Sequence, residues 1–147
     1  MTTPAAAIAL AIRDRLSQIT TFGGFLTDAG QNVALGWREL RDDAPLPCLT
    51  LVEIGHGIDG DAVRGRNLQV RIDWIVEGLT RVQDDALTPL YAIEADVLRA
   101  LFADDFKPAG RWVRLNYQGR ELIPPEDGST LAAVRIRLTT IHQEVFP

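Results

Sequence analysis

The chain has 147 residues, close to the commonest domain size, which predicts one core and a single domain over residues 1–147. Apolar residues make up 46% and charged residues 24%, a balance typical of globular proteins and unlike that of disordered ones. The formal net charge of −5 argues against nucleic-acid binding of a general or sequence-specific kind, because such binding needs a basic surface.

Cysteine usage and hydropathy indicate the compartment. Cys48 is the only cysteine, so no intrachain disulfide is possible and a reducing environment is expected. The apolar segment Ala5–Ile12 is too short to span a membrane and has no basic leader, which favours a helix over a signal peptide. We therefore expect a cytoplasmic protein that makes no membrane contact.

The first expected element is a helix over residues 4–20. Thr3 precedes Pro4, the arrangement of a capping side chain followed by proline in the first turn. Four apolar residues recur at spacings of four, four and three and form one stripe: Ile8, Ile12, Leu16 and Ile19.

Three strands are expected next, over residues 32–40, 48–54 and 67–77, with a proline-containing loop over residues 41–47. The third is the clearest, because apolar and polar residues alternate along it and only Ile75 breaks the pattern. Its apolar side consists of Leu68, Val70, Ile72, Trp74 and Val76.

Residues 55–66 connect the last two of these strands. This segment contains four glycines and charges of both signs, which predicts a flexible, extended hairpin loop.

A second helix is expected over residues 85–102, with the aspartates at its start facing the positive end of the helix dipole. Two further strands are expected over residues 111–117 and 131–143, separated by a proline-rich turn over residues 123–128. The helix has a buried stripe of Leu90, Ile93, Val97 and Leu101, widened by Leu98 and Phe102.

This order of elements predicts an α+β fold. Strands with one apolar face form a sheet that is wet on one side, and such sheets are mostly antiparallel. The two helices are expected to pack together on the apolar face of the sheet, in two layers.

Residues that could support catalysis are scarce. The chain has two histidines and two serines, and neither Ser17 nor Ser129 lies in a Gly-x-Ser-x-Gly turn. The only lysine, Lys107, precedes a proline, so there is no phosphate-binding loop, and Cys48 lies within an apolar run. We therefore expect no enzymatic activity and no cofactor.

Clusters of acidic residues have structural explanations. His56, Asp59 and Asp61 resemble part of a calcium loop, but no glutamate follows at the required distance, so no metal is expected. Three adjacent aspartate pairs fall at element boundaries, where aspartate caps helices or begins turns: Asp42–Asp43, Asp84–Asp85 and Asp104–Asp105.

The polar face of the sheet carries charges of both signs: Glu53, Arg71, Asp73, Glu77, Arg135 and Arg137. These charges fit either a solvent-exposed face with cross-strand ion pairs or a contact between subunits. Together with the charged residues of the glycine-rich loop, they give the candidate partner contacts: Asp59, Asp61, Arg64, Arg66, Arg71, Asp73, Arg135 and Arg137.

The chain resembles the tail-terminator proteins of long-tailed bacteriophages and related prophages, of the lambda minor tail protein U type. The resemblance spans nearly the whole chain and consists of local signatures at residues 16–19, 45–51, 95–101 and 125–129. The signatures read Leu-Ser-Gln-Ile, Pro-Leu-Pro-Cys-Leu-Thr-Leu, Ala-Asp-Val-Leu-Arg-Ala-Leu and Pro-Glu-Asp-Gly-Ser. The family fold that it implies is a mixed, mostly antiparallel sheet with helices on one side.

The resemblance implies a structural protein of virion assembly. Such proteins form a ring, usually a hexamer, that caps the tail tube, stops its polymerisation and provides the surface that joins the head. The implied partners are copies of the same chain, the tail tube protein and the head–tail connector protein. The implied location is the host cytoplasm during assembly and then the virion tail.

Other classes stay open. Other small tail-completion or head–tail joining proteins share similar patterns. A small ligand-binding α+β domain could line a pocket with Trp37, Trp74 and Trp112, although core packing explains large aromatic residues more often. A monomeric adaptor is a further alternative.

Overall fold

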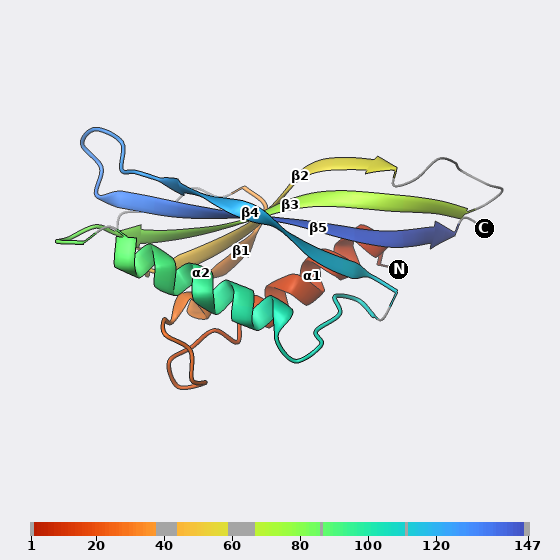
Figure 1. The fold of residues 1–147 in the computed structure, drawn as a ribbon, viewed down its shortest axis with the longest axis horizontal. Coiled ribbons are helices and arrows are strands. Elements are labelled where there is room, and N and C mark those ends of the chain that lie inside the picture. The colour runs from red at the N-terminus through yellow and green to blue at the C-terminus, as the bar shows by residue number, and fades with distance from the viewer. Residues whose placement is uncertain (1, 38–43, 59–66, 86, 111, 146–147) are drawn as a thin grey trace.

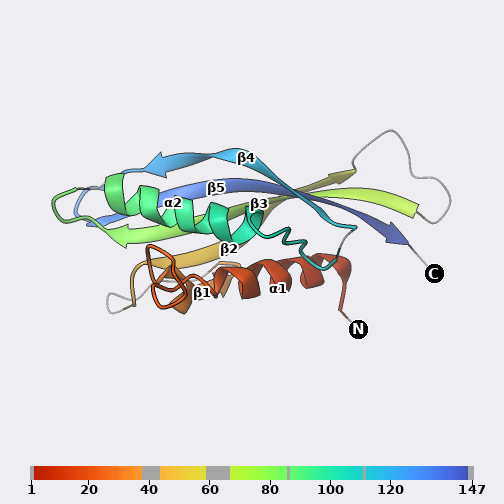
Figure 2. The same ribbon diagram turned by 60° about the horizontal axis from the view of Figure 1, so that its bottom comes forward.

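The computed structural model describes residues 2–37, 44–58, 67–85, 87–110 and 112–145. Its elements in chain order are α1 (Pro4–Leu16), the short 3-10 helix η1 (Ala29–Gln31), β1 (Val33–Leu35), β2 (Cys48–Ile58), β3 (Asn67–Arg81), α2 (Leu87–Phe102), β4 (Arg114–Ile123) and β5 (Leu131–Val145). The strands form one twisted sheet, and both helices lie side by side against one of its faces (Figures 1 and 2).

The sheet has five strands in the order β1-β2-β3-β5-β4. β1 pairs with β2 in parallel, and the other three pairings are antiparallel. The predicted α+β fold, with a mixed, mostly antiparallel sheet and two helices on one face, is therefore confirmed.

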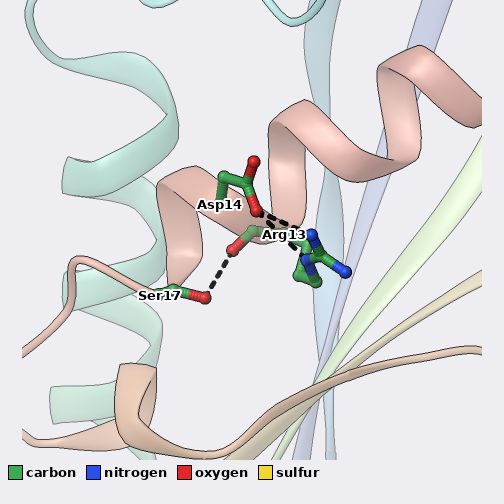
Figure 3. A network of polar contacts seen from close by, with 3 residues as sticks. All are labelled: Arg13, Asp14 and Ser17. Atoms are coloured by element: carbon green, nitrogen blue, oxygen red, sulfur yellow. Dashed lines mark hydrogen bonds and ion pairs between the residues drawn. The ribbon is translucent and has the colours of Figure 1, made fainter.

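Helix α1 begins as predicted, because the backbone N–H of Ala6 donates to the side chain of Thr3 at 3.2 Å. It ends at Leu16, four residues before the predicted end. There the hydroxyl of Ser17 donates to the carbonyl of Arg13 at 2.9 Å, on the exposed side where the Arg13 guanidinium contacts Asp14 (Figure 3). The chain then turns, yet Ile19 stays fully buried with the rest of the predicted stripe.

Helix α2 begins two residues later than predicted, since Asp85 lies before the helix and caps it. Its predicted stripe is buried, and Leu98 packs against the core. Phe102 was wrongly assigned to the buried stripe: its side chain is 40% exposed and its ring meets the edge of Tyr117, with centroids 6.4 Å apart.

Arg15 joins the two helices. Its Nε donates to the carbonyl of Ala100 at 2.7 Å, and its guanidinium lies 3.7 Å from Asp104 and over the ring of Phe106. Satisfying this carbonyl near the end of α2 fixes the helix against α1.

Strand β2 is longer than expected. It continues to Ile58, so residues 55–58 are strand rather than loop, and the register shifts between Glu53 and Gly55. The rest of the predicted flexible loop, residues 59–66, lies outside the described residues. β2 and β3 pair in antiparallel register, as the predicted hairpin requires.

Strand β4 was predicted over residues 111–117 but runs from Arg114 to Ile123. Its register shifts between Tyr117 and Gly119, and Gly119 has a φ of 111°, which favours glycine. This bulge breaks the alternation of side chains that would have revealed the second half of the strand.

The core lies between the helices and the sheet. Apolar side chains of both helices pack on one face of β2, β3 and β5, and Trp74 is buried among them. Trp37 and Trp112 are exposed, so they are not part of the core in which Trp74 is buried. Within the described ranges, the helices are too short or too polar to cross a membrane.

Candidate interaction surface on the open sheet face

The side of the sheet opposite the helices, here called the open face, carries the polar side chains of the long strands. Along β3 the buried residues alternate with Arg71, Asp73, Ile75 and Glu77, which project from the other side. β5 contributes Arg135, Arg137 and Thr139 to the same side, directly opposite Glu77, Ile75 and Asp73.

Four of the eight predicted contact residues are brought together on the open face: Arg71, Asp73, Arg135 and Arg137. The other four, Asp59, Asp61, Arg64 and Arg66, lie outside the described residues. Glu53 was also predicted on this face. In the structure it lies opposite Trp74, whose side chain faces the helices, beside the bulge in β2.

Ion pairs cross the open face from strand to strand. Nε of Arg135 donates to Glu77 at 2.7 Å, and the guanidinium of Arg137 lies 3.7 Å from Glu121 of β4. Arg71 and Asp73 form a third pair at 3.4 Å along β3. All of these side chains are partly exposed, so each pair stabilises the fold by no more than about 1 kcal/mol.

Glycines of β2 make room for the Arg71–Asp73 pair. A Cβ atom on Gly55 would lie 2.8 Å from Oδ2 of Asp73, and one on Gly57 would lie 3.4 Å from Nη2 of Arg71. Two of the four glycines that suggested a flexible loop, Gly55 and Gly57, therefore lie under charged side chains of the next strand.

Two shallow hollows adjoin on this face, and Ile54 lines both. The larger, about 530 Å³, has a mixed lining that includes the polar residues Arg71, Asp73, Arg137, Asn116 and Gln118 and the apolar residues Leu138 and Ile141. The smaller, about 280 Å³, has apolar walls that include Trp37, Val52, Ile75 and Leu79. Neither is enclosed, which suits contact with another surface better than capture of a small ligand.

Three contributors to this surface were missed by the sequence prediction. Glu121 and Gln118 belong to the part of β4 that the bulge concealed. Trp37 was expected inside a strand, but β1 ends at Leu35 and the Trp37 side chain is 87% exposed. An exposed tryptophan in this position gives no sequence signal that separates it from a core tryptophan.

The open face is basic although the chain is acidic. Counted over the described residues, the face carries five arginines (Arg71, Arg81, Arg114, Arg135 and Arg137) and three carboxylates (Asp73, Glu77 and Glu121). The described part of the chain elsewhere holds twelve carboxylates and five cations. Over the described residues, the open face and the rest of the molecule thus differ in the sign of their net charge.

The acidic pairs play structural roles where they are described. The carboxylate of Asp85 accepts from the backbone N–H groups of Leu87 and Thr88 and contacts the Thr88 hydroxyl. These hydrogen bonds, first that of the Thr88 side chain, lower the pKa of Asp85 below its ordinary value of 3.8. Asp104 and Asp105 follow α2 with positive φ angles, as turn residues do, and Asp42–Asp43 lie outside the described residues.

In the part of the chain that the structure describes, one carboxylate and one imidazole are buried. Asp96 of α2 accepts hydrogen bonds from the loop that follows α1, and His142 of β5 contacts Glu144 at 3.0 Å. Among the described residues, no three His, Cys, Asp or Glu side chains are grouped so that they could hold a metal ion.

No protein-family model matches the chain, and a search of curated proteins finds no match. Solved structures do match. The chain is similar to a chain of the virion of a native gene transfer agent particle, with a TM-score of 0.65 and 14% sequence identity. The match covers 98% of this chain and 100% of the other. At this identity the likeness shows that the two chains share a fold over their whole length.

Proposed function

We propose that this chain is a structural protein of a phage-like virion that closes the tail tube as a ring. In this role it stops polymerisation of the tube and provides the surface that joins the head. The observation that carries the proposal is the fold match with a chain of the gene transfer agent virion, because that match covers 98% of this chain and 100% of the other.

Two independent features support the proposal. The local signatures at residues 16–19, 45–51, 95–101 and 125–129 resemble those of tail terminators. The open face combines an apolar hollow with cross-strand charges, a mixture that resembles the surface of a protein–protein interface.

The proposed role is one of assembly without catalysis, metal or cofactor. The partners are copies of the same chain in a hexameric ring, the tail tube protein and the head–tail connector protein. The protein acts in the host cytoplasm during assembly and then stays in the virion tail.

A second candidate is another small protein of tail completion or head–tail joining. The similar solved chain belongs to a virion particle, and the match fits either task equally. The two candidates differ in what happens when the protein is missing.

Deletion of the gene from its phage or prophage, followed by electron microscopy of the particles, separates these candidates. Loss of a terminator gives tubes that exceed the normal length, whereas loss of a joining protein gives tails of normal length beside unattached heads. Restoring the gene from a plasmid should return joined particles of normal length. Normal particles in the deletion strain would refute both candidates.

A further inference from the structure

The loop between α1 and η1 displays two apolar side chains to solvent. Phe22 is fully exposed and Leu26 is 69% exposed, and together they are called the knob below. Exposed single apolar residues are common, but two on one short loop form a surface that a partner would bury.

Buried and aromatic contacts hold this loop in place. Asp96, only 2% exposed, accepts from the backbone N–H groups of Leu26 at 2.9 Å and Thr27 at 2.7 Å, and from the Thr27 hydroxyl at 2.7 Å. Arg99 donates to the carbonyl of Gly24 at 2.7 Å and lies over the ring of Phe25.

Burying a carboxylate costs free energy, which here is offset by hydrogen bonds that fix the backbone of a surface loop. These bonds fix the backbone of the loop that carries the knob, which lowers the backbone entropy that a partner must remove on binding.

The apolar hollow of the open face, called the groove below, has a size that suits the knob. Its volume is about 280 Å³, whereas a cavity of about 150 Å³ is enough to hold a benzene ring. Trp37, Ile54 and Ile75 supply apolar walls, and the Glu77–Arg135 pair lies at its edge.

Knob and groove lie on opposite sides of the molecule. In Figure 1 the orange-red loop after α1 hangs below the helices, while the open face is the upper side of the sheet. A contact between two copies that joins knob to groove is therefore heterologous, the kind of contact that closes into a ring when its rotation allows.

Charge favours the same pairing. The open face has an excess of arginine, and the excess carboxylates lie on the rest of the molecule, among them Asp28 at the base of the loop. Opposite potentials on the two sides attract one copy to the next and disfavour contact between like faces.

We propose that the knob of one copy, Phe22 and Leu26, docks in the open-face groove of the next copy, beside Trp37 and Ile54. This inference rests on the proposed ring and names the contact that builds it. The contact is head-to-tail, with a small apolar centre and a surrounding of opposite charge.

Site-directed cross-linking tests the contact. The double variant Phe22→Cys/Ile54→Cys keeps Leu26 and Trp37 at the contact, and a disulfide traps even a weakened contact. It should therefore form a ladder of disulfide-linked oligomers under mild oxidation, both in concentrated protein and in assembled particles. The matched control is Phe22→Cys/Ile58→Cys. Ile58 lies on the same strand with similar exposure but pairs with Val70, whose side chain faces the helices, so this control should not form the ladder.

Mixing two variants tests the head-to-tail geometry. Phe22→Ser/Leu26→Ser removes the knob and Ile54→Asp blocks the groove, and each change should weaken self-association by roughly thirtyfold, as interface hot spots do. An equimolar mixture should then form dimers of one copy of each variant and nothing larger, because only one intact knob and one intact groove can meet. Native mass spectrometry detects this product directly, and circular dichroism confirms that both variants fold.

The inference is wrong if the Phe22→Cys/Ile54→Cys protein gives no ladder in protein or particles, or if both variants still form rings. Overlong tails in the gene deletion, together with absent cross-links, would reject this contact and leave the terminator role standing. Normal particles in the deletion, together with specific cross-links, would reject the terminator role and leave the contact standing.

Discussion

Trp74 packs in the core and also links two strands of the sheet. The side chain is buried on the helix-facing side of β3, and its indole Nε1 donates to the hydroxyl of Thr140 on β5 at 2.9 Å. The hydrogen bond satisfies both polar groups in an apolar setting, where an unsatisfied group would be costly.

Trp74→Ala should lower the free energy of unfolding by about 3–5 kcal/mol, because it leaves a large cavity and an unpaired hydroxyl. Trp74→Phe keeps most of the volume and should cost less, chiefly the lost hydrogen bond. Urea unfolding followed by circular dichroism measures both changes. Arg71→Ala, which breaks a partly exposed ion pair, is the control and should cost no more than about 1 kcal/mol.

Asp85 links stability to pH through the start of α2. Because its pKa is lowered in the folded state, its contribution is fully present above the unfolded value of 3.8 and disappears as the pH falls through the folded value. Asp85→Ala should therefore melt at a lower temperature than wild type at neutral pH, and the difference should shrink in acid. A difference that stays constant from neutral pH to below 3.8 would contradict the capping role.

At the scale of elements, sequence patterns predicted both α-helices and, with errors in their bounds, the five strands, but they did not predict η1. The stripes of α1 and α2 and the alternation in β3 and β5 are long enough to be unambiguous. Where periodicity breaks, prediction failed: the bulge at Gly119 concealed half of β4, and glycines at 55 and 57 suggested a loop inside β2.

Half of the candidate surface could be predicted from the sequence, again because its residues follow the alternation of regular strands. Arg71, Asp73, Arg135 and Arg137 occupy alternating positions of regular strands, so their shared face follows from sequence. Trp37 and the knob depend on how irregular segments fold over the sheet and helices, and no local pattern encodes that. The assignment of the chain to a single domain stays a prediction.

Gly78 lies where β3 and α2 approach each other closely. A Cβ atom at this position of β3 would lie 2.5 Å from Cγ2 of Ile93 on α2, in the centre of the core. Gly78→Ala should therefore force α2 from the sheet and lower the free energy of unfolding by about 1–3 kcal/mol. Gly57→Ala, where the nearest atom is the movable guanidinium of Arg71 at 3.4 Å, should have little effect. Equal urea midpoints for the two variants would show that α2 adapts without strain.

At the scale of the whole molecule, the separation of charge between the open face and the rest predicts that self-association depends on salt. Raising the ionic strength should weaken association, because it screens the attraction between opposite faces. Arg137→Glu, on the open face, should also weaken it. Arg13→Glu makes the same change in charge on α1 and should not. Sedimentation velocity over a range of salt concentrations gives both comparisons, and equal effects of the two variants would rule out the head-to-tail pairing of charged faces.

The pairing of β3 with β5 also governs how the chain reaches its fold. These strands are paired along their whole length, from Arg81 with Leu131 to Asn67 with Val145, and α2 and β4 lie between them in sequence. The centre of the sheet therefore forms only after the two ends of a long stretch of chain have come together. This loop closure lowers the entropy of the chain before the contacts between β3 and β5 can compensate for it. Until β5 arrives, β3 has one unpaired apolar edge, the kind of edge on which partly folded chains aggregate. The strand order that places β3 beside β5 thus makes folding slow. The yield of refolded protein should therefore fall as the protein concentration rises.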